Sequence, residues 1–358
     1  YIFSFLPAVL APEISKLYNN DKKEDIKELV NISIIISMLV GTFLSLSIFN
    51  FSDKVVNIFI GDKANIRSYA IEYLKFRTMS FPFVFTNSVV FSILRGMTDF
   101  NNAIIINLQS QIINIIIDPI LMKKYGLKGV AIGSNIADIY CTVRYLILFK
   151  DKKLYSKTIP NIFVKGRELL SKGIFVQIKN ICNNLVYLFI NNKVIQLDKD
   201  GSQTAAHILS AKLYDLGRVL FDGLSSVSSI IIPSEKIFDN DLIAKKRLLH
   251  WSNIFGLSQF FLYLVLSLNV SLLTNDLNVI AQVKKLLIII SVLQYFSGLT
   301  STNEGILQGY QKYKTQSLLA VMSLIIMVTL TSLSKSVEQI WMTGIIISII
   351  KLLCFRII

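Results

Sequence analysis

Long apolar stretches, separated by short polar loops, recur along the whole chain. Seven of them have about 20 residues, the length that a helix needs to cross the ~30 Å hydrocarbon core of a bilayer. With the shorter apolar stretches between them, they predict an all-α polytopic membrane protein with about 11 spans, the first one partial. The seven stretches are residues 29–49, 69–94, 103–122, 129–149, 248–273, 315–334 and 338–358.

Composition supports a membrane protein. Hydrophobic residues make up 53% and charged residues 17% of the 358 residues, whereas about a quarter of the residues in soluble domains are charged. Any single stretch has the alternative of being a buried helix in a soluble protein, but the number of stretches argues against this for the whole chain. The sequence does not distinguish the plasma membrane from an organelle membrane.

The net charge of +14 comes from Lys and Arg residues dispersed over the loops. Loops on one side carry more of them, and the positive-inside rule makes that side cytoplasmic. The chain has no basic stripe, zinc spacing or aromatic platform of the kind found in nucleic-acid binders. We therefore expect contacts with membrane lipids and no nucleic-acid partner.

Cysteine and histidine give no sign of a metal centre. Cys141, Cys182 and Cys354 lie in separate apolar stretches, and their odd number and spacing predict no disulfide framework. His207 and His250 form no metal-binding motif, and no Gly-rich phosphate loop is present. An ATP-driven pump and a membrane metalloprotease both lose support, so we expect no enzyme activity, no metal and no cofactor.

The chain contains an internal repeat. A shift of 213 positions aligns residues 59–100 with residues 272–313 without a gap and pairs Gly96 with Gly309. Transporters are commonly built from such repeats, with binding sites between or within the halves. We expect an N-terminal lobe, a basic cytoplasmic linker and a C-terminal lobe at residues 1–149, 150–172 and 173–358.

One apolar stretch carries an ionisable group at bilayer depth. Asp118 follows Asn114 by four positions, so the two share a helix face and present carboxylate and amide oxygens together. A charge at that depth is tolerated mainly in a bundle interior or a water-filled cavity, which favours a role in ion binding. The positions shifted by 213 hold Met327 and Thr331, so the second lobe lacks this pair.

Two further carboxylates leave alternatives open. Asp138, one turn after Ser134, either takes part in ion passage or pairs with a neighbouring helix or with Arg144. Glu304 either exchanges a proton for a cationic cargo or is a buried acid hydrogen-bonded to Ser301 or Asn303. Charges at helical spacing also predict a structural ladder, formed by Lys212, Asp215, Arg218 and Asp222.

Short strings at the ends and turns of the apolar stretches follow a characteristic order. In the first lobe these are Tyr73-Leu-Lys-Phe-Arg77-Thr-Met-Ser-Phe-Pro82, Leu94-Arg95-Gly96-Met-Thr-Asp99, Asn114-Ile-Ile-Ile-Asp118-Pro119 and Gly126-Leu-Lys-Gly129-Val-Ala131-Ile-Gly-Ser134. In the second lobe they are Ala205-Ala206-His207, Asp222-Gly223-Leu224 and Glu304-Gly305-Ile-Leu307-Gln-Gly309. In this order the strings resemble the multidrug and toxic compound extrusion (MATE) family of antiporters.

The resemblance implies two pseudo-symmetric lobes of the MATE/MOP flippase type, normally with six helices each, and is strongest to the DinF and plant plastid branch. It implies that residues 1–15 are the end of the second family helix, so that the first helix is missing from this sequence. It also implies a cation site at Asn114, Asp118 and the hydroxyl of Ser134. The motif residues with an expected structural role are Arg77, Pro82, Arg95, Gly96, Asp99, Pro119, Gly129, Asp222 and Gly309.

The function that follows from the resemblance is secondary antiport. We expect a monomer that exports organic cations, drugs or metabolites in exchange for H+ or Na+ by alternating access. One alternative is a flippase for lipid-linked precursors, left open by Lys179 and Arg218 inside the spans. Another is a remnant or scaffold that does not transport.

Overall fold

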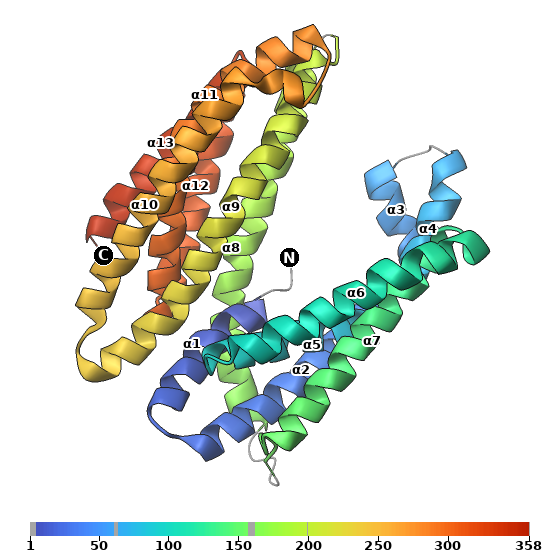
Figure 1. Cartoon of the computed structure of the whole chain (residues 1–358), viewed down its shortest axis with the longest axis vertical. Coiled ribbons are helices and arrows are strands. Elements are labelled where there is room, and N and C mark those ends of the chain that lie inside the picture. Colours follow the sequence, from blue (N-terminus) through green and yellow to red (C-terminus); the bar gives the residue numbers. More distant parts are fainter. Residues whose placement is uncertain (1–4, 61–63, 157–161, 199, 358) are drawn as a thin grey trace. The chain divides into compact units, whose positions relative to one another are not determined.

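The computed structural model describes residues 5–60, 64–156, 162–198 and 200–357. Over these ranges the chain is helical, with thirteen α-helices, two short 3-10 helices and no strand. It divides into two compact units, one formed by Leu6–Ser171 and the other built on Lys172–Ile358 (Figure 1). The predicted all-α fold is confirmed, and each unit is described below by itself.

Among the described residues, seven helices make up most of the first unit. Its closest packing joins α6 to α7 and α2 to α5, while α4 also packs on α7. Figure 1 shows α6 and α7 lying along each other. The helices are α1 (Phe5–Asn19), α2 (Lys23–Asn50), α3 (Ser52–Ile60), α4 (Ala64–Thr78), α5 (Phe81–Gly96), α6 (Phe100–Tyr125) and α7 (Leu127–Asp151).

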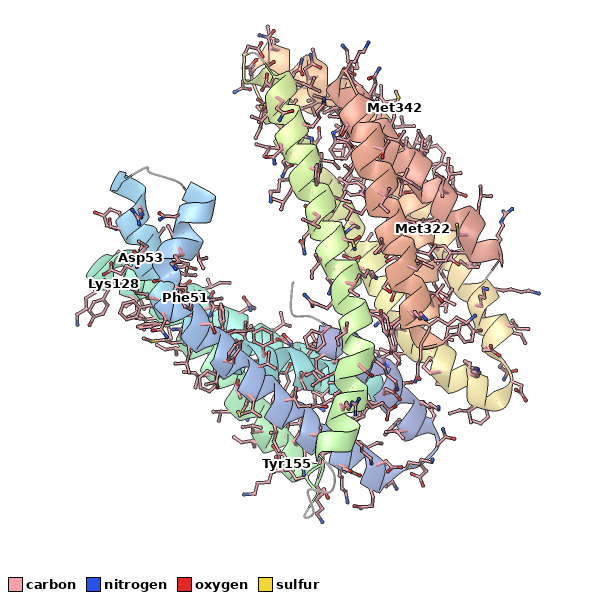
Figure 2. The ribbon with its side chains drawn as sticks, turned by 180° about the vertical axis from the view of Figure 1, so that it is seen from behind. Phe51, Asp53, Lys128, Tyr155, Met322 and Met342 are labelled. Atoms are coloured by element: carbon pink, nitrogen blue, oxygen red, sulfur yellow. The ribbon has the colours of Figure 1, made fainter. Side chains whose placement is uncertain are left out.

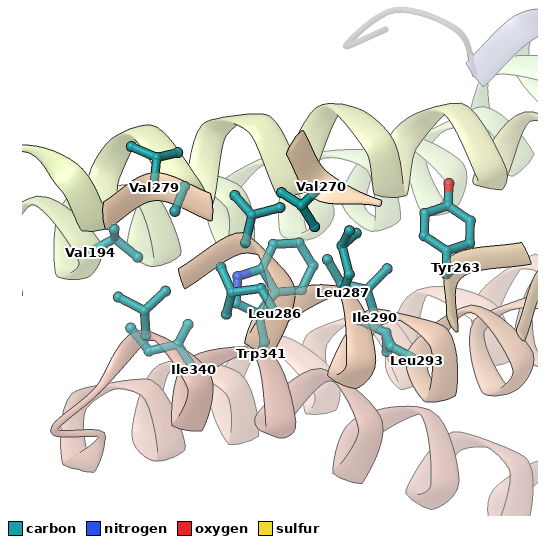
Figure 3. Close-up of a cluster of buried hydrophobic side chains, with 13 residues drawn as sticks. Val194, Tyr263, Val270, Val279, Leu286, Leu287, Ile290, Leu293, Ile340 and Trp341 are labelled. Atoms are coloured by element: carbon teal, nitrogen blue, oxygen red, sulfur yellow. The ribbon is translucent and has the colours of Figure 1, made fainter. Parts of the chain in front are cut away.

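The second unit is organised around α11, which packs against α9, α10, α12 and α13. Its core contains Tyr263, Leu286, Ile290 and Trp341, all buried (Figure 3). The helices are α8 (Ile162–Leu197), α9 (Ser202–Glu235), α10 (Asp241–Leu268), α11 (Leu277–Gly309), α12 (Tyr313–Leu333) and α13 (Val337–Ile357), and the 3-10 helices are Lys236–Phe238 and Val270–Leu272. The first turns of α8 occupy the end of the predicted 150–172 linker.

Large apolar side chains cover the outside of the helices. On α2, Leu39, Phe43 and Leu46 follow one helix face and are 65%, 70% and 59% exposed. Met322 on α12 and Met342 on α13 are also exposed (Figure 2). An apolar outer surface of this kind suits contact with lipid. The helices also bond their own backbone N–H and C=O groups, as the hydrocarbon core requires. Among the described residues, eight helices are long and apolar enough to span a membrane: α2, α6, α8, α9, α10, α11, α12 and α13.

The predicted single span at 69–94 is wrong, because the chain breaks there into α4 and α5. Pro82 lies in the first turn of α5, where a missing N–H costs no helical hydrogen bond. Ser80, just before α5, accepts a hydrogen bond from the Arg77 guanidinium. At the repeat-related position the second unit has Tyr295 in place of Pro82, and α11 continues without a break.

The two repeat glycines occupy similar surroundings in their own units. A Cβ at Gly96 would lie 2.7 Å from the Ala11 carbonyl oxygen, next to Pro12 in α1. A Cβ at Gly309 would lie 2.8 Å from Ile232 Cβ, next to Pro233 in α9. In each unit a glycine at the end of a helix therefore lets a proline-containing helix pack closely against it.

Candidate functional site

The contact between α6 and α7 depends on two glycines four residues apart. A Cβ at Gly129 would overlap the backbone of Leu121, and a Cβ at Gly133 would overlap the carboxylate of Asp118. Small residues at this spacing allow the backbones of two membrane helices to approach each other. The tight crossing brings the polar side chains of α6 against α7.

The three predicted cation-site residues meet at this crossing. Asn114 Nδ2 donates to Asp118 Oδ1 at 2.9 Å and to Ser134 Oγ at 3.2 Å. All three side chains are half-buried, while Ile115 and Ile116 beside them are exposed on α6. Within the described residues no hydrogen bond reaches Asp118 Oδ2. A carboxylate oxygen and a hydroxyl oxygen therefore meet around the Asn114 amide at one point of an otherwise apolar surface.

Pro119 adds one more oxygen to this region. It lies inside α6, which continues to Tyr125. Because proline has no N–H, the Ile115 carbonyl lacks its usual helical donor. Hard cations prefer oxygen ligands of this type, whereas a proton needs only the carboxylate.

Asp138 belongs to a different network from the predicted cation site. Its Oδ2 pairs with Arg77 Nη1 at 2.7 Å, and its backbone carbonyl accepts from Asn87 Nδ2 at 2.9 Å. Arg77 Nη1 also donates to Asn135 Oδ1 at 3.3 Å and to Ser80. Asp138 therefore pairs with a residue of the neighbouring helix α4, as one alternative predicted, and the predicted pairing with Arg144 is wrong. This network ties α7 to the break between α4 and α5.

Asp99 and Arg95 have separate structural surroundings. Asp99 forms an ion pair with Lys152 at the end of α7 and accepts from Asn102 Nδ2 at 2.9 Å. Burial raises the pKa of the Asp99 carboxyl. The hydrogen bonds from Lys152 and Asn102, together with the positive charge of Lys152, outweigh this effect and hold that pKa below its usual value. The Arg95 guanidinium lies over the Phe91 ring, 5.9 Å from its centroid.

The second unit contains a cavity of about 370 Å³ that is lined by five charged side chains. Glu304 on α11 lies between two lysines: Lys179 Nζ is 2.8 Å from Oε2, and Lys351 Nζ is 3.0 Å from Oε1. The lysines come from α8 and α13. The other two charged residues, on α9, are Arg218 and Asp222.

The expected hydrogen-bond partners of Glu304 are wrong. Ser301 Oγ donates to the Phe221 carbonyl at 3.3 Å, and Asn303 Nδ2 donates to the Leu299 carbonyl at 2.8 Å. Lys351 was not predicted as a site residue. Its signal was present, because a lysine inside an apolar span requires a partner.

The predicted ladder on α9 forms only where it enters the cavity. Arg218 Nε lies 3.5 Å from Asp222 Oδ2, and Arg218 Nη1 donates to the Tyr187 hydroxyl at 2.9 Å. Lys212 and Asp215 are exposed and do not line the cavity. The charged end of the cavity therefore contains three cations and two carboxylates.

The other part of the cavity wall is aromatic. Tyr214 and Trp341 have ring centroids 5.8 Å apart. Trp341 Nε1 donates to His207 Nδ1 at 3.2 Å, and His207 Nε2 lies 3.0 Å from Asn191 Oδ1. With Nδ1 as an acceptor, His207 is neutral and donates from Nε2. Among the residues that the structure describes, no cluster of three or more His, Cys, Asp or Glu side chains is placed to hold a metal.

Comparisons with known proteins connect this geometry to one fold. The MatE family model matches residues 2–120, a range that includes Asn114, Asp118 and Pro119. No curated protein sequence matches the chain.

Solved transporters match the chain at 17% identity over 99% of its length. A MATE structure in the bent conformation has a TM-score of 0.88 and is covered over 83% of its own chain. An outward-facing multidrug resistance MATE transporter of the MOP superfamily has a TM-score of 0.85 and is covered over 84%. A MOP superfamily transporter from Pyrococcus furiosus Vc1 has a TM-score of 0.83 and 84% coverage, and reverse polarity of its binding pocket is reported to suggest a different function.

The family match covers the first unit up to Asp118 and Pro119, and the structural matches extend over both units. Eight apolar helices in the described residues are long enough to cross a bilayer. The chain is therefore an integral multi-pass membrane protein with the fold of the MATE transporters.

Proposed function

We propose that this chain is a MATE-family secondary transporter that exchanges a small organic cargo for H+ or Na+. The observation that carries the proposal is the cluster of Asn114, Asp118 and Ser134 at the tight α6–α7 crossing. The second-lobe string Glu304-Gly305-Ile-Leu307-Gln-Gly309 favours the DinF and plant plastid branch. Organic cations, drugs and metabolites are the proposed cargo classes.

The physical role of the cluster is to hold one positive charge. An ionised Asp118 in an apolar wall is costly, and a bound proton or Na+ lowers that cost. The state with the ion and the state without it then differ in charge at α6 and α7. Such a difference is what allows an ion gradient to favour one conformation of a transporter over another.

The test follows efflux of organic cations from proteoliposomes under an imposed H+ or Na+ gradient. Asp118→Asn removes the charge with almost no change in volume and should abolish gradient-driven flux. Asp276→Asn is the matched control, because Asp276 caps the exposed start of α11 and Asn caps equally well. Unchanged flux in Asp118→Asn would remove the cluster from the mechanism.

Ser134→Ala tests whether Na+ or H+ is the coupling ion. It removes one oxygen and leaves the carboxylate in place. If Na+ is the coupling ion, the Na+ concentration for half-maximal flux should rise, because a ligand oxygen is lost. If H+ is the coupling ion, the pH dependence of flux should change little.

A second candidate function is the transport of anionic or lipid-linked molecules. It is favoured by the three cationic side chains in the cavity of the second unit, Lys179, Arg218 and Lys351. For the Pyrococcus furiosus Vc1 transporter, which has this fold, reverse polarity of the binding pocket is reported to suggest a different function. No flux of organic cations under either gradient would favour this function, or a chain that does not transport.

A further inference from the structure

We propose that the cavity of the second unit binds a small amphipathic organic anion, with a carboxylate, sulfonate or phosphate ester held by Lys179, Lys351 and Arg218. Glu304 is the internal carboxylate that occupies part of this site when the ligand is absent. The proposal concerns binding, and it rests on the proposed function only for the step from binding to transport.

The first argument is a charge imbalance. Two ammonium groups, Lys179 and Lys351, share the single carboxylate of Glu304. Arg218 is balanced by Asp222 on the next turn of α9. The cavity therefore has one positive charge more than it can pair with its own residues. Asp215, the nearest further acid on α9, also acts on the charge of Arg218, but it is exposed and lies outside the cavity lining, so it does not pair with the two lysines.

The second argument is burial. The side chains of Lys179, Lys351 and Glu304 are 17%, 16% and 19% exposed, so they are largely removed from solvent. An unmatched charge is costly inside a helical membrane bundle and is stabilised by a partner of opposite sign. A monoanionic ligand would supply that partner, whereas a cationic ligand would add to the imbalance.

The third argument is the shape and chemistry of the remaining wall. The cavity of about 370 Å³ is within the size range of small-molecule sites. Tyr187, Tyr214 and Trp341 line it, and His207 contributes a neutral ring hydrogen-bonded to Trp341. Flat apolar groups pack well against aromatic rings. A ligand with an anionic head and an aromatic body therefore matches both parts of the cavity.

A cationic cargo paired with Glu304 is the competing interpretation. Such a cargo would have to displace two lysine ammonium groups that already bind both carboxylate oxygens. The displaced lysines would then be left unpaired in the cavity. The two interpretations predict opposite effects for the same substitution at Glu304.

The experiment measures calorimetric binding of two probes of matched shape, 2-naphthoate and 2-naphthylmethylammonium, to the full chain in a non-ionic detergent. We expect one naphthoate per chain and at least about tenfold weaker binding of the ammonium probe. Lys179→Gln and Arg218→Gln should each weaken naphthoate by about tenfold, because each removes a charged hydrogen-bond donor. Lys284→Gln, an exposed lysine of α11, is the surface control and should change nothing.

The decisive variant is Glu304→Gln. It removes the competing carboxylate and should tighten naphthoate binding by about tenfold. The cationic-cargo interpretation instead predicts that the native chain binds the ammonium probe more tightly than naphthoate and that the variant loses ammonium binding. If two unpaired lysines prevent folding, Glu304→Gln combined with Lys351→Met keeps the net charge of the cavity. This double variant should bind naphthoate about as tightly as the native chain.

Two further measurements complete the test. The first distinguishes a lipid phosphate from a free solute as the bound anion, and the second distinguishes a failure of ion coupling from a failure of anion binding. Naphthoate binding in nanodiscs of zwitterionic lipid that weakens when phosphatidylglycerol is added would identify a lipid phosphate as a competing occupant; unchanged binding would favour a free solute. Asp118→Asn should bind naphthoate normally, so a failure of ion coupling leaves this proposal intact. Equal affinity for the two probes, or no effect of Lys179→Gln, would overturn it.

Discussion

At the residue scale, the position of a charged side chain depends on the space and the oppositely charged partners that neighbouring residues provide. Asp118 can lie against α7 because position 133 is a glycine. Asp138, one turn from Ser134, faces Arg77 instead and is neutralised by it. The two carboxylates, in adjacent helices, thus have different partners, although Asp118 was predicted as a cation ligand and a role in ion passage was left open for Asp138. The role of each in ion coupling remains a prediction.

Gly129→Ala tests the tight crossing. The added methyl group would overlap the Leu121 carbonyl, which cannot move without shifting α6, and we expect a loss of about 1–3 kcal/mol in stability together with impaired ion coupling. Gly223→Ala in α9 is the matched control, because a Cβ there meets nothing within 4 Å and alanine favours a helix. Thermal unfolding in detergent measures both. Equal melting temperatures for the two variants would contradict the crossing geometry.

The ion pair of Asp99 with Lys152 predicts a pH effect on stability. The pKa of Asp99 is lower in the folded protein than in the unfolded chain. The pair therefore stabilises the fold above the unfolded pKa of about 3.9, and this contribution is lost as the pH falls through the lower folded pKa.

Asp99→Asn should lower stability at pH 7 by less than about 1 kcal/mol, because the pair is partly exposed. The difference from the native chain should vanish as Asp99 becomes protonated in the folded protein, which melting temperatures from pH 7 to pH 3 can follow. A difference that stays constant over this range would show that the charge of Asp99 does not matter.

At the element scale, one residue decides whether a repeat forms two helices or one. Pro82 opens α5 after the break that follows α4, and its repeat-related residue Tyr295 lies inside the continuous α11. The Tyr295 hydroxyl donates to Asn253 Oδ1 at 2.9 Å and its ring packs on Gly256. The break places Arg77 beside Asp138, while the continuous helix carries Glu304 to its two lysines.

Tyr295→Pro should prevent folding of the second unit, since proline inside a helix costs about 3 kcal/mol or more and the hydroxyl bond is lost as well. Tyr295→Phe loses only one hydrogen bond and should cost about 1 kcal/mol. The yield of monodisperse protein after size-exclusion chromatography checks the first, and the melting temperature checks the second. A well-folded proline variant would show that α11 tolerates the break seen between α4 and α5.

At the scale of the whole molecule, the repeat builds two units that each pack a glycine against a proline-containing helix of their own. Gly96→Leu should therefore loosen α1 and α5, and Gly309→Leu should loosen α9 and α11. Hydrogen–deuterium exchange measures this helix by helix. Increased exchange in both units from either substitution would contradict their separate cores.

The sequence by itself determined the features that depend on local spacing. Apolar stretches of sufficient length specified membrane helices, because lipid leaves the backbone no other hydrogen-bond partner. The four-residue spacing placed Asn114 and Asp118 on one face, and the structure shows them hydrogen-bonded. The repeat was also visible, since related units retain similar patterns along the chain.

Only the tertiary structure decided which charges meet. Asp138 and Arg77 are 61 positions apart, and Glu304 and Lys351 are 47 apart, so no helical period connects them. Their pairing depends on which helices pack together and on small residues that permit close approach. A buried charge signals in sequence that a partner exists, but its identity is set by the fold.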